Sequence, residues 1–176
     1  DMNTFNTSKI ELAESVREFK DSAQATLSSL SPIDRLRQFR NKSPRFDPSI
    51  WSELVNAGWS SILVSEELGG LGLDIEHACA IAAAIGQHPL PEPFTAIAIQ
   101  SVTVLNSLQK GAQRDQLLSD ISSGKLMVGL GWQESVGQVE PTEVLNTHAI
   151  QTLDSYILNG KKLWVTPGTG ANGWLI

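Results

Sequence analysis

The sequence is poor in cysteine, in basic residues and in long apolar runs. Cys79 is the one cysteine among 176 residues, which excludes an intrachain disulfide, and its Ala- and Ile-rich neighbours indicate packing rather than an activated thiolate. Lysine and arginine number 13 against 19 acidic residues, a formal net charge of -6, which argues against a nucleic-acid-binding protein. The polar first residues contain no apolar signal-peptide region, so we expect a soluble, cytoplasmic protein without a membrane span.

Several common catalytic motifs are also missing. The chain has no G-x-S-x-G elbow and no G-x-x-x-x-G-K-[ST] loop, which removes the usual serine-hydrolase and P-loop classes. His77, His88 and His148 lie far apart in the sequence, so we predict no metal site. Glu66 and Glu67 are neighbours whose side chains would point to different sides, and we interpret them as part of a solvated loop rather than an acid/base pair.

A formal G-x-G-x-x-G motif occurs at Gly168, Gly170 and Gly173. In a dinucleotide-binding turn, a helix must begin at the last glycine so that its N-terminal amides meet the pyrophosphate. Here the strand-like run Trp-Leu-Ile follows at residues 174–176 instead. We therefore interpret these glycines as turns between strands.

The first two-thirds of the chain carry helical periodicity. Apolar side chains recur at steps of three and four from Ser8 to Leu30, which predicts one amphipathic helix. Ser31-Pro32 and Asp47-Pro48 each combine an N-cap residue with a proline tolerated in the first helical turn, so each predicts a helix start. Three more helices are predicted after Asp74, over Phe94 to Leu108 and over Ala112 to Ser122, and a fixed glycine-rich loop is predicted over Glu67 to Gly72.

Beyond Gly124 the pattern changes to short β-type runs. Strands are predicted at Leu126 to Trp132, Thr147 to Leu153, Tyr156 to Leu158 and Lys161 to Thr166, and another begins at Trp174. Asp154-Ser155 and Asn159-Gly160 lie between the last three of the four, and Asn159-Gly160 is the strongest hairpin signal. The expected fold class is multi-domain α and β, with an all-helical domain over residues 1–124 followed by an antiparallel β domain over residues 125–176. Because the last strand would leave an unpaired edge, we expect this chain to be the front part of a longer polypeptide.

Trp164 and Thr166 are the most suggestive pair in the β half. Alternation along the predicted strand would place both side chains on one face, where a flat ring and a hydroxyl would suit a planar heterocycle. Core packing is the alternative for a tryptophan in a strand. The strand end from Leu130 to Gln133 is similarly suggestive and similarly unspecific.

The order of these pieces resembles the acyl-CoA dehydrogenase family along nearly the whole chain. The segment from residues 57–59 through residues 65–73 is similar to the end of the family's helix and its P-E-x-x-G-G-x-G loop. Residues 111–118 and 121–126 are similar to the stretch in which a glycine-led helix precedes the L-x-x-G-E segment and the first strand. Residues 156–166 resemble the family's Y-x-L-N-G-x-K-x-W-I-T hairpin. Together, in order and at plausible spacing, these motifs are fairly specific.

The resemblance implies N-terminal helices, a middle β domain and a C-terminal helical bundle, with FAD between the β domain and the bundle. It implies that Trp164 lies against the isoalloxazine ring and that Thr166 hydrogen-bonds near flavin N5. The catalytic base is expected C-terminal to this chain, so no catalytic residue is predicted within it. The predicted cofactor-binding residues are Leu130, Trp132, Gln133, Trp164, Val165 and Thr166.

The implied activity is α,β-dehydrogenation of an acyl-CoA thioester, with electrons passed to an electron-transfer flavoprotein. A homo-oligomer (dimer or tetramer) or a hetero-oligomer with a homologue is expected. The family continues from the strand end as T-E-P-x-A-G-S-D, whereas residues 133–140 read QESVGQVE and keep only Glu134 and Gly137. Since the family's Gly-Ser pair helps to hold the flavin pyrophosphate and the thioester, two alternatives stay open: a non-catalytic partner subunit of a heteromeric acyl-CoA dehydrogenase, and an oxidase or monooxygenase on the same fold.

Overall fold

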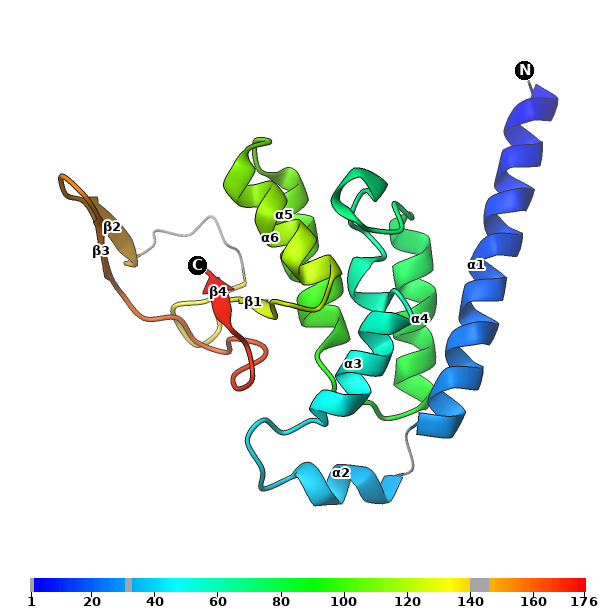
Figure 1. Cartoon of the computed structure of the whole chain (residues 1–176), viewed down its shortest axis with the longest axis horizontal. Coiled ribbons are helices and arrows are strands. Elements are labelled where there is room, and N and C mark those ends of the chain that lie inside the picture. The colour runs from blue at the N-terminus through cyan, green and yellow to red at the C-terminus, as the bar shows by residue number, and fades with distance from the viewer. Residues whose placement is uncertain (1, 31–32, 140–145) are drawn as a thin grey trace.

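The computed structural model describes residues 2–30, 33–139 and 146–176. Figure 1 shows the helices grouped at one end of the molecule and a β-hairpin extending from the other end. The helical elements are α1 (Met2–Leu30), α2 (Ile33–Phe39), α3 (Pro48–Asn56), α4 (Ile75–Gln87), α5 (Val102–Ser107) and α6 (Ala112–Ser122), with short 3-10 turns η1 (Trp59–Ser61) and η2 (Glu66–Leu68) and a π-helix η3 (Thr95–Ser101). The strands are β1 (Val128–Leu130), β2 (His148–Gln151), β3 (Tyr156–Asn159) and β4 (Gly173–Leu175).

Helix α3 begins as its sequence predicts. The Asp47 carboxylate accepts hydrogen bonds from the Ser49 amide at 2.9 Å and the Ser49 hydroxyl at 2.7 Å, and Pro48 occupies the first turn. Helix α4 likewise begins after Asp74, but that side chain makes no capping hydrogen bond. The start predicted at Ser31-Pro32 lies outside the described residues.

Helix α1 lies along α4 (Figure 1). Small and branched side chains from the two helices join the core, among them Ala23, Leu27, Ala78 and Ile81. Cys79 is exposed on α4, so the interpretation of this cysteine as a packing residue is wrong. Within the described ranges, none of the helices combines the length and the apolar character that crossing a membrane requires.

The helix predicted from Phe94 to Leu108 is present but changes its winding part-way. Its first half is the π-helix η3, in which the Ser101 hydroxyl donates to the carbonyl of Ala96 at 3.0 Å, and its second half is α5. Ile97 and Val102 are fully buried, as expected for a helix that is apolar nearly all round. Helix η3 packs against β1 and so supports the start of the β part.

The glycine-rich loop is fixed by backbone hydrogen bonds, as predicted. The amide of Gly72 donates to Val64 at 2.8 Å and that of Leu73 to Ile62 at 2.9 Å. Gly70 lies so close to the Val64 backbone that a Cβ there would collide with the Val64 carbonyl. The Ser122 hydroxyl donates to the Gly69 carbonyl at 2.6 Å and ties the end of α6 to this loop.

The β part differs from the prediction in its pairing. Strands β2 and β3 form an antiparallel hairpin, as the fold class anticipates. Its turn lies at residues 152–155, which include the predicted Asp154-Ser155, and the Thr152 amide donates to the Ser155 carbonyl at 2.8 Å. The two-residue hairpin predicted at Asn159-Gly160 is therefore wrong. Strands β1 and β4 pair in parallel, with Val128 opposite Gly173, so the predicted strand at Trp174 exists but in a pairing that the antiparallel expectation did not include.

The predicted strand from Lys161 to Thr166 is also wrong. Only Thr166 takes part in an isolated antiparallel bridge, opposite Leu130, and the preceding residues are irregular. The reason is that this segment hydrogen-bonds to residues 130–133 instead of continuing beside β2. The chain turns away from β2 at Gly160, whose φ is 148°. A Cβ at this position would collide with Thr147.

Candidate cofactor site at the end of strand β1

The residues that follow β1 lie beside the segment that leaves the hairpin. The Leu130 amide donates to the Thr166 carbonyl at 3.4 Å, and the Leu163 amide donates to the Gln133 carbonyl at 2.7 Å. These two contacts bring the predicted residues Leu130, Trp132 and Gln133 together with Trp164, Val165 and Thr166. The structure therefore gathers all six at one place, although it does so through irregular backbone rather than through a sheet.

Trp164 has an unusual backbone for a bulky residue, with a φ of 55°. Its side chain is 71% exposed, so the indole is presented outward and does not belong to the core. The predicted alternation that placed Trp164 and Thr166 on one strand face is wrong, because no strand forms there. An outlier of this kind at a candidate site is a position where function can account for the backbone strain.

Backbone donors accompany this exposed ring. Among the residues that the structure describes, no hydrogen bond joins the amides of Trp132, Gln133 or Trp164 to another group. The Thr166 side chain is exposed nearby. The site therefore offers several N–H and O–H donors to an acceptor-rich molecule.

A pocket of about 510 Å³ separates Thr166 from the helical part. That volume falls within the range of small-molecule sites. Thr166, Pro167, Gly168 and Thr169 line one side, and the segment that runs from the end of α4 into η3 lines the other. The residues of that second side include Ile85, Leu90, Pro93, Phe94 and Ala96.

The loop after Gln133 closes on itself through Gln138. The Gln138 side-chain oxygen accepts a hydrogen bond from the Glu134 amide at 2.7 Å, and the Gln138 carbonyl accepts one from the Gln133 carboxamide at 3.1 Å. Gln138 is 6% exposed, whereas Val136 and Val139 are 80% and 82% exposed. The carboxamide of Gln133 is thus already engaged within the loop, and Glu140 lies outside the described residues.

Glu134 is the centre of the polar contacts behind this site. Its carboxylate accepts hydrogen bonds from Lys162 Nζ at 2.8 Å, from the Thr147 amide at 3.0 Å and from the Asn146 amide at 2.5 Å. The Lys162 ammonium, followed by Thr147 and by the Asn146 amide, lowers the pKa of Glu134 to about 2. Glu134 is therefore a carboxylate at neutral pH, suited to holding cations and donors rather than to taking up a proton.

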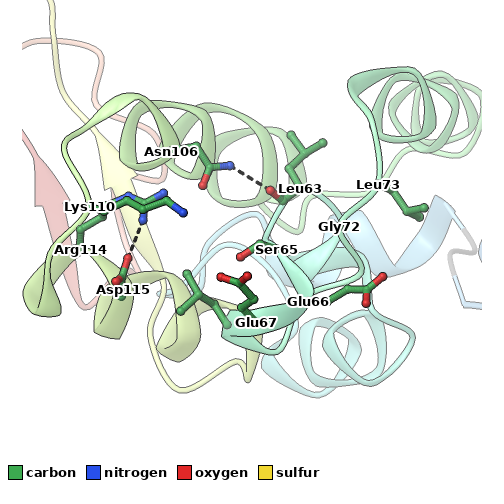
Figure 2. Close-up of a pocket in the computed structure, with 11 residues that line it drawn as sticks. Leu63, Ser65, Glu66, Glu67, Gly72, Leu73, Asn106, Lys110, Arg114 and Asp115 are labelled. Atoms are coloured by element: carbon green, nitrogen blue, oxygen red, sulfur yellow. Dashed lines mark hydrogen bonds and ion pairs between the residues drawn. The ribbon is translucent and has the colours of Figure 1, made fainter.

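A second pocket, of about 670 Å³, lies between the glycine-rich loop and the turn from α5 to α6. Figure 2 shows Arg114 bonded to Asp115, and Asn106 bonded to the Leu63 carbonyl. The carboxylates of Glu66 and Glu67 point to different sides, as predicted for this pair, although both belong to the turn η2 rather than to an extended loop. The predicted cofactor-binding residues do not line this pocket.

Sequence reasoning missed four polar residues at or beside the β1 site. Glu134 matches one letter of the family motif, and its partner Lys162 lies 28 residues further along the chain. No sequence pattern around Gln138 predicts the hydrogen bonds by which it closes the loop after Gln133. Glu92, which borders the 510 Å³ pocket, lies in a Pro-x-Pro run that reads only as a helix end.

The family model for the N-terminal domain of acyl-CoA dehydrogenases matches residues 10–125 of this chain. The chain belongs to the acyl-CoA dehydrogenase family. Two curated relatives in this family are the very long-chain specific acyl-CoA dehydrogenase of Mus musculus, 29% identical over 118 residues, and the isovaleryl-CoA dehydrogenase of Solanum tuberosum, 26% identical over 174 residues. The aligned parts cover 65% and 95% of this acyl-CoA dehydrogenase family chain, but only 18% and 40% of the relatives.

Solved structures show the same fold as this member of the acyl-CoA dehydrogenase family. A structure described as the electron transferring flavoprotein of Acidaminococcus fermentans has a TM-score of 0.76 at 21% identity and matches 92% of this chain and 42% of its own. The ChsE4-ChsE5 complex from Mycobacterium tuberculosis has a TM-score of 0.70 at 19% identity and matches 84% of this chain and 39% of its own. The chain thus spans less than half the length of these relatives.

Proposed function

We propose that the protein is an FAD-dependent oxidoreductase that carries out the α,β-dehydrogenation of an acyl-CoA thioester. Family membership supports the reaction class. The observation that carries the site is the 510 Å³ pocket, which has Thr166 on one side and the apolar residues Ile85, Leu90, Phe94 and Ala96 on the other. The proposal includes a helical domain at residues 1–124 and the start of a β domain at residues 125–176.

The chemistry of the donor set fits a flavin. The exposed Trp164 indole offers a flat surface for an isoalloxazine ring. The amides of Trp132, Gln133 and Trp164 and the hydroxyl of Thr166 offer donors for the nitrogen and carbonyl oxygen atoms along its polar edge. We propose that these residues, with Leu130 and Val165, hold the ring.

When bound, FAD would accept the hydride that leaves the β-carbon of the acyl group. The residues of this chain would bind FAD and the acyl group and would exclude water from the site. The apolar wall at Leu90, Phe94 and Ala96 favours an acyl chain over water, and a water-poor site favours both proton and hydride transfer. We propose an electron-transfer flavoprotein as the acceptor partner and a homo- or hetero-oligomer as the assembly.

The first experiment is an absorption spectrum of the full-length protein purified without added cofactor. A panel of acyl-CoA thioesters is then added under anaerobic conditions. We expect a flavin spectrum that bleaches with at least one thioester. A protein that holds flavin but bleaches with none of them would contradict the dehydrogenase function, and oxygen consumption without another acceptor would instead indicate an oxidase or monooxygenase.

A non-catalytic partner subunit is the second candidate, and one observation favours it. Gln138 closes the loop after Gln133 upon itself, where the family's motif has a glycine followed by a serine that help to hold the pyrophosphate and the thioester. One of the structural neighbours is described as a complex of two named proteins, ChsE4 and ChsE5. A colourless protein that restores activity only when co-expressed with a homologue would support this candidate, and a yellow, active protein purified alone would exclude it.

A further inference from the structure

One carboxylate fastens both ends of the β2–β3 hairpin to the segment that follows β1. Asn146 and Thr147, which lead into β2, donate their amides to Glu134. Lys162, which lies just after β3, donates to the same carboxylate at 2.8 Å. The hairpin therefore depends on Glu134 at the point where it leaves the molecule.

This ion pair is shielded from solvent. The side chains of Lys162 and Glu134 are 10% and 6% exposed, in contrast to the hairpin itself, whose four opposed residue pairs are all exposed. Loss of one partner would leave the other charge in a poorly hydrated place. An ion pair with this burial holds its geometry far better than an exposed pair, because water does not compete for its hydrogen bonds.

The pair also lies between the two groups of predicted cofactor-binding residues. Glu134 directly follows Gln133, and Lys162 precedes Trp164 by two residues. Next to the pair, the Leu163 amide donates to the Gln133 carbonyl at 2.7 Å, and Lys162 Nζ reaches the Trp132 carbonyl at 3.4 Å. The ion pair and these two contacts set the separation between the Trp132–Gln133 backbone and the Trp164–Thr166 backbone.

We propose that Glu134 and Lys162 are positioning residues, whose ion pair fixes the two backbone segments that together receive the flavin ring. We call the Glu134–Lys162 ion pair, with the Asn146 and Thr147 amides that donate to Glu134, the clamp. The role toward the cofactor rests on the proposed function, whereas the clamp itself concerns only this chain. Neither residue touches the reacting atoms, because both are turned inward behind the loop. Removing the clamp lets the two segments separate and misplaces the ring relative to the pocket.

The test uses the full-length protein and three lysine variants. Lys162→Met removes the charge and keeps the aliphatic stem, Lys162→Arg restores a charged donor, and Lys161→Met removes the neighbouring lysine, which is exposed. Hydrogen exchange at the Thr147 and Leu163 amides reports on the clamp without any cofactor. The FAD dissociation constant, the visible flavin spectrum, and kcat and KM measured separately report on positioning.

We expect Lys162→Met to speed exchange at both amides, to shift the flavin spectrum and to weaken FAD binding by roughly tenfold to a hundredfold, with kcat falling more than KM changes. Lys162→Arg should recover most of each effect, and Lys161→Met should resemble the wild type. If Lys162→Met fails to fold, Glu134→Gln, which keeps an acceptor oxygen for the two amides, takes its place with the same expectations.

Faster exchange with an unchanged flavin spectrum, unchanged FAD affinity and unchanged kcat would overturn the positioning role, and unchanged exchange would overturn the clamp. A wild-type protein that takes up no flavin at all would instead contradict the proposed function. In that case the exchange contrast between Lys162→Met and Lys161→Met still decides whether the clamp exists.

Discussion

Arg35 and Glu92 form a two-point ion pair inside the helical part, with Nη1 to Oε1 at 2.6 Å and Nη2 to Oε2 at 3.0 Å. Their side chains are 9% and 0% exposed. Glu92 also accepts the Asp47 amide at 3.0 Å, so the pair joins α2, the residue that caps α3 and the segment that borders the 510 Å³ pocket. The hydrogen bonds that Arg35 donates to the Glu92 carboxylate raise the pKa of Arg35 above its usual value.

Replacing Arg35 by methionine should therefore be strongly destabilising. The variant leaves the Glu92 carboxylate buried without its counter-ion, which costs about 3–5 kcal/mol of unfolding free energy. Urea unfolding of the full-length protein measures this loss. The matched control is Arg37→Met, because the Arg37–Asp34 pair is 79% and 77% exposed and contributes about 0–1 kcal/mol. Equal effects of the two variants would contradict a structural role for the buried pair.

The two aspartates at helix starts should differ when replaced. Asp47→Ala removes a carboxylate that accepts from the Ser49 amide and hydroxyl, and should cost about 1 kcal/mol. Asp74→Ala removes a side chain with no capping hydrogen bond and should cost only a few tenths of a kcal/mol, roughly the scale of a surface substitution. The two variants are compared by the midpoints of their urea unfolding curves, provided that the dependence of unfolding free energy on urea is the same in both. A larger loss of unfolding free energy in Asp74→Ala than in Asp47→Ala would contradict the finding that Asp47 caps its helix and Asp74 does not.

The sequence predicted the helices better than the strands, for a physical reason. Periodicity and capping are local, so the bounds Ala112–Ser122 and the cap at Asp47 follow from neighbouring residues. The π-helix at Thr95–Ser101 was not predictable, because a run that is apolar on all sides carries no information about its winding.

Strand pairing depends on residues that are distant in sequence. The chain turns at residues 152–155, which include the weaker Asp154-Ser155 signal, and not at Asn159-Gly160. The Thr152 hydroxyl donates to the Ser155 carbonyl and hydrogen-bonds to the Ser155 hydroxyl. The parallel pairing of β1 with β4 joins Val128 to Gly173, which lie far apart in the sequence, and no local pattern specifies it. The candidate site followed from motif resemblance, whereas its Glu134–Lys162 support came only from the structure.

Two glycines should respond in opposite directions to an added methyl group. Gly70→Ala should lower the unfolding free energy by more than about 1 kcal/mol, because its Cβ would collide with the Val64 backbone. Gly86→Ala should raise it by roughly 0.5–1 kcal/mol, because Gly86 lies within α4 with nothing within 4 Å of a new Cβ. Thermal or urea unfolding of both variants checks the signs. Stabilisation by Gly70→Ala would contradict the close approach of the loop to Val64.

The low pKa of Glu134 predicts an acid-dependent loss of stability. Its pKa falls from 4.5 to about 2 in the folded protein, so the folded state binds this proton more weakly than the unfolded chain does. The resulting stabilisation is complete above about pH 4.5 and disappears as the pH falls through about 2. In unfolding experiments between these pH values, the unfolding free energy should depend less on pH in Glu134→Gln than in the wild type.

Lys162→Met provides the complementary measurement, because the ammonium is the largest cause of that shift. A carbon-detected NMR titration should show the pKa of Glu134 rising back toward its ordinary value in Lys162→Met and staying low in Lys161→Met. A pKa near 4.5 in the wild type would contradict the ion pair.

Under the proposed function, removal of FAD should uncover Trp164. Trp164 is 71% exposed, and a flavin ring lying against its indole would cover one face. Fluorescence quenching by acrylamide should therefore increase when FAD is removed. Most of this increase should be lost in Trp164→Phe, and the remainder comes from the half-buried Trp132, which belongs to the same proposed site. Trp174→Phe is the control, because Trp174 is also partly exposed, at 45%, but its indole N–H is held by the Pro167 carbonyl at 3.1 Å. Trp51 and Trp59 are buried and contribute little to the change, since acrylamide reaches exposed rings first. An increase that persists in Trp164→Phe but disappears in Trp174→Phe would move the flavin away from the end of β1 and toward β4.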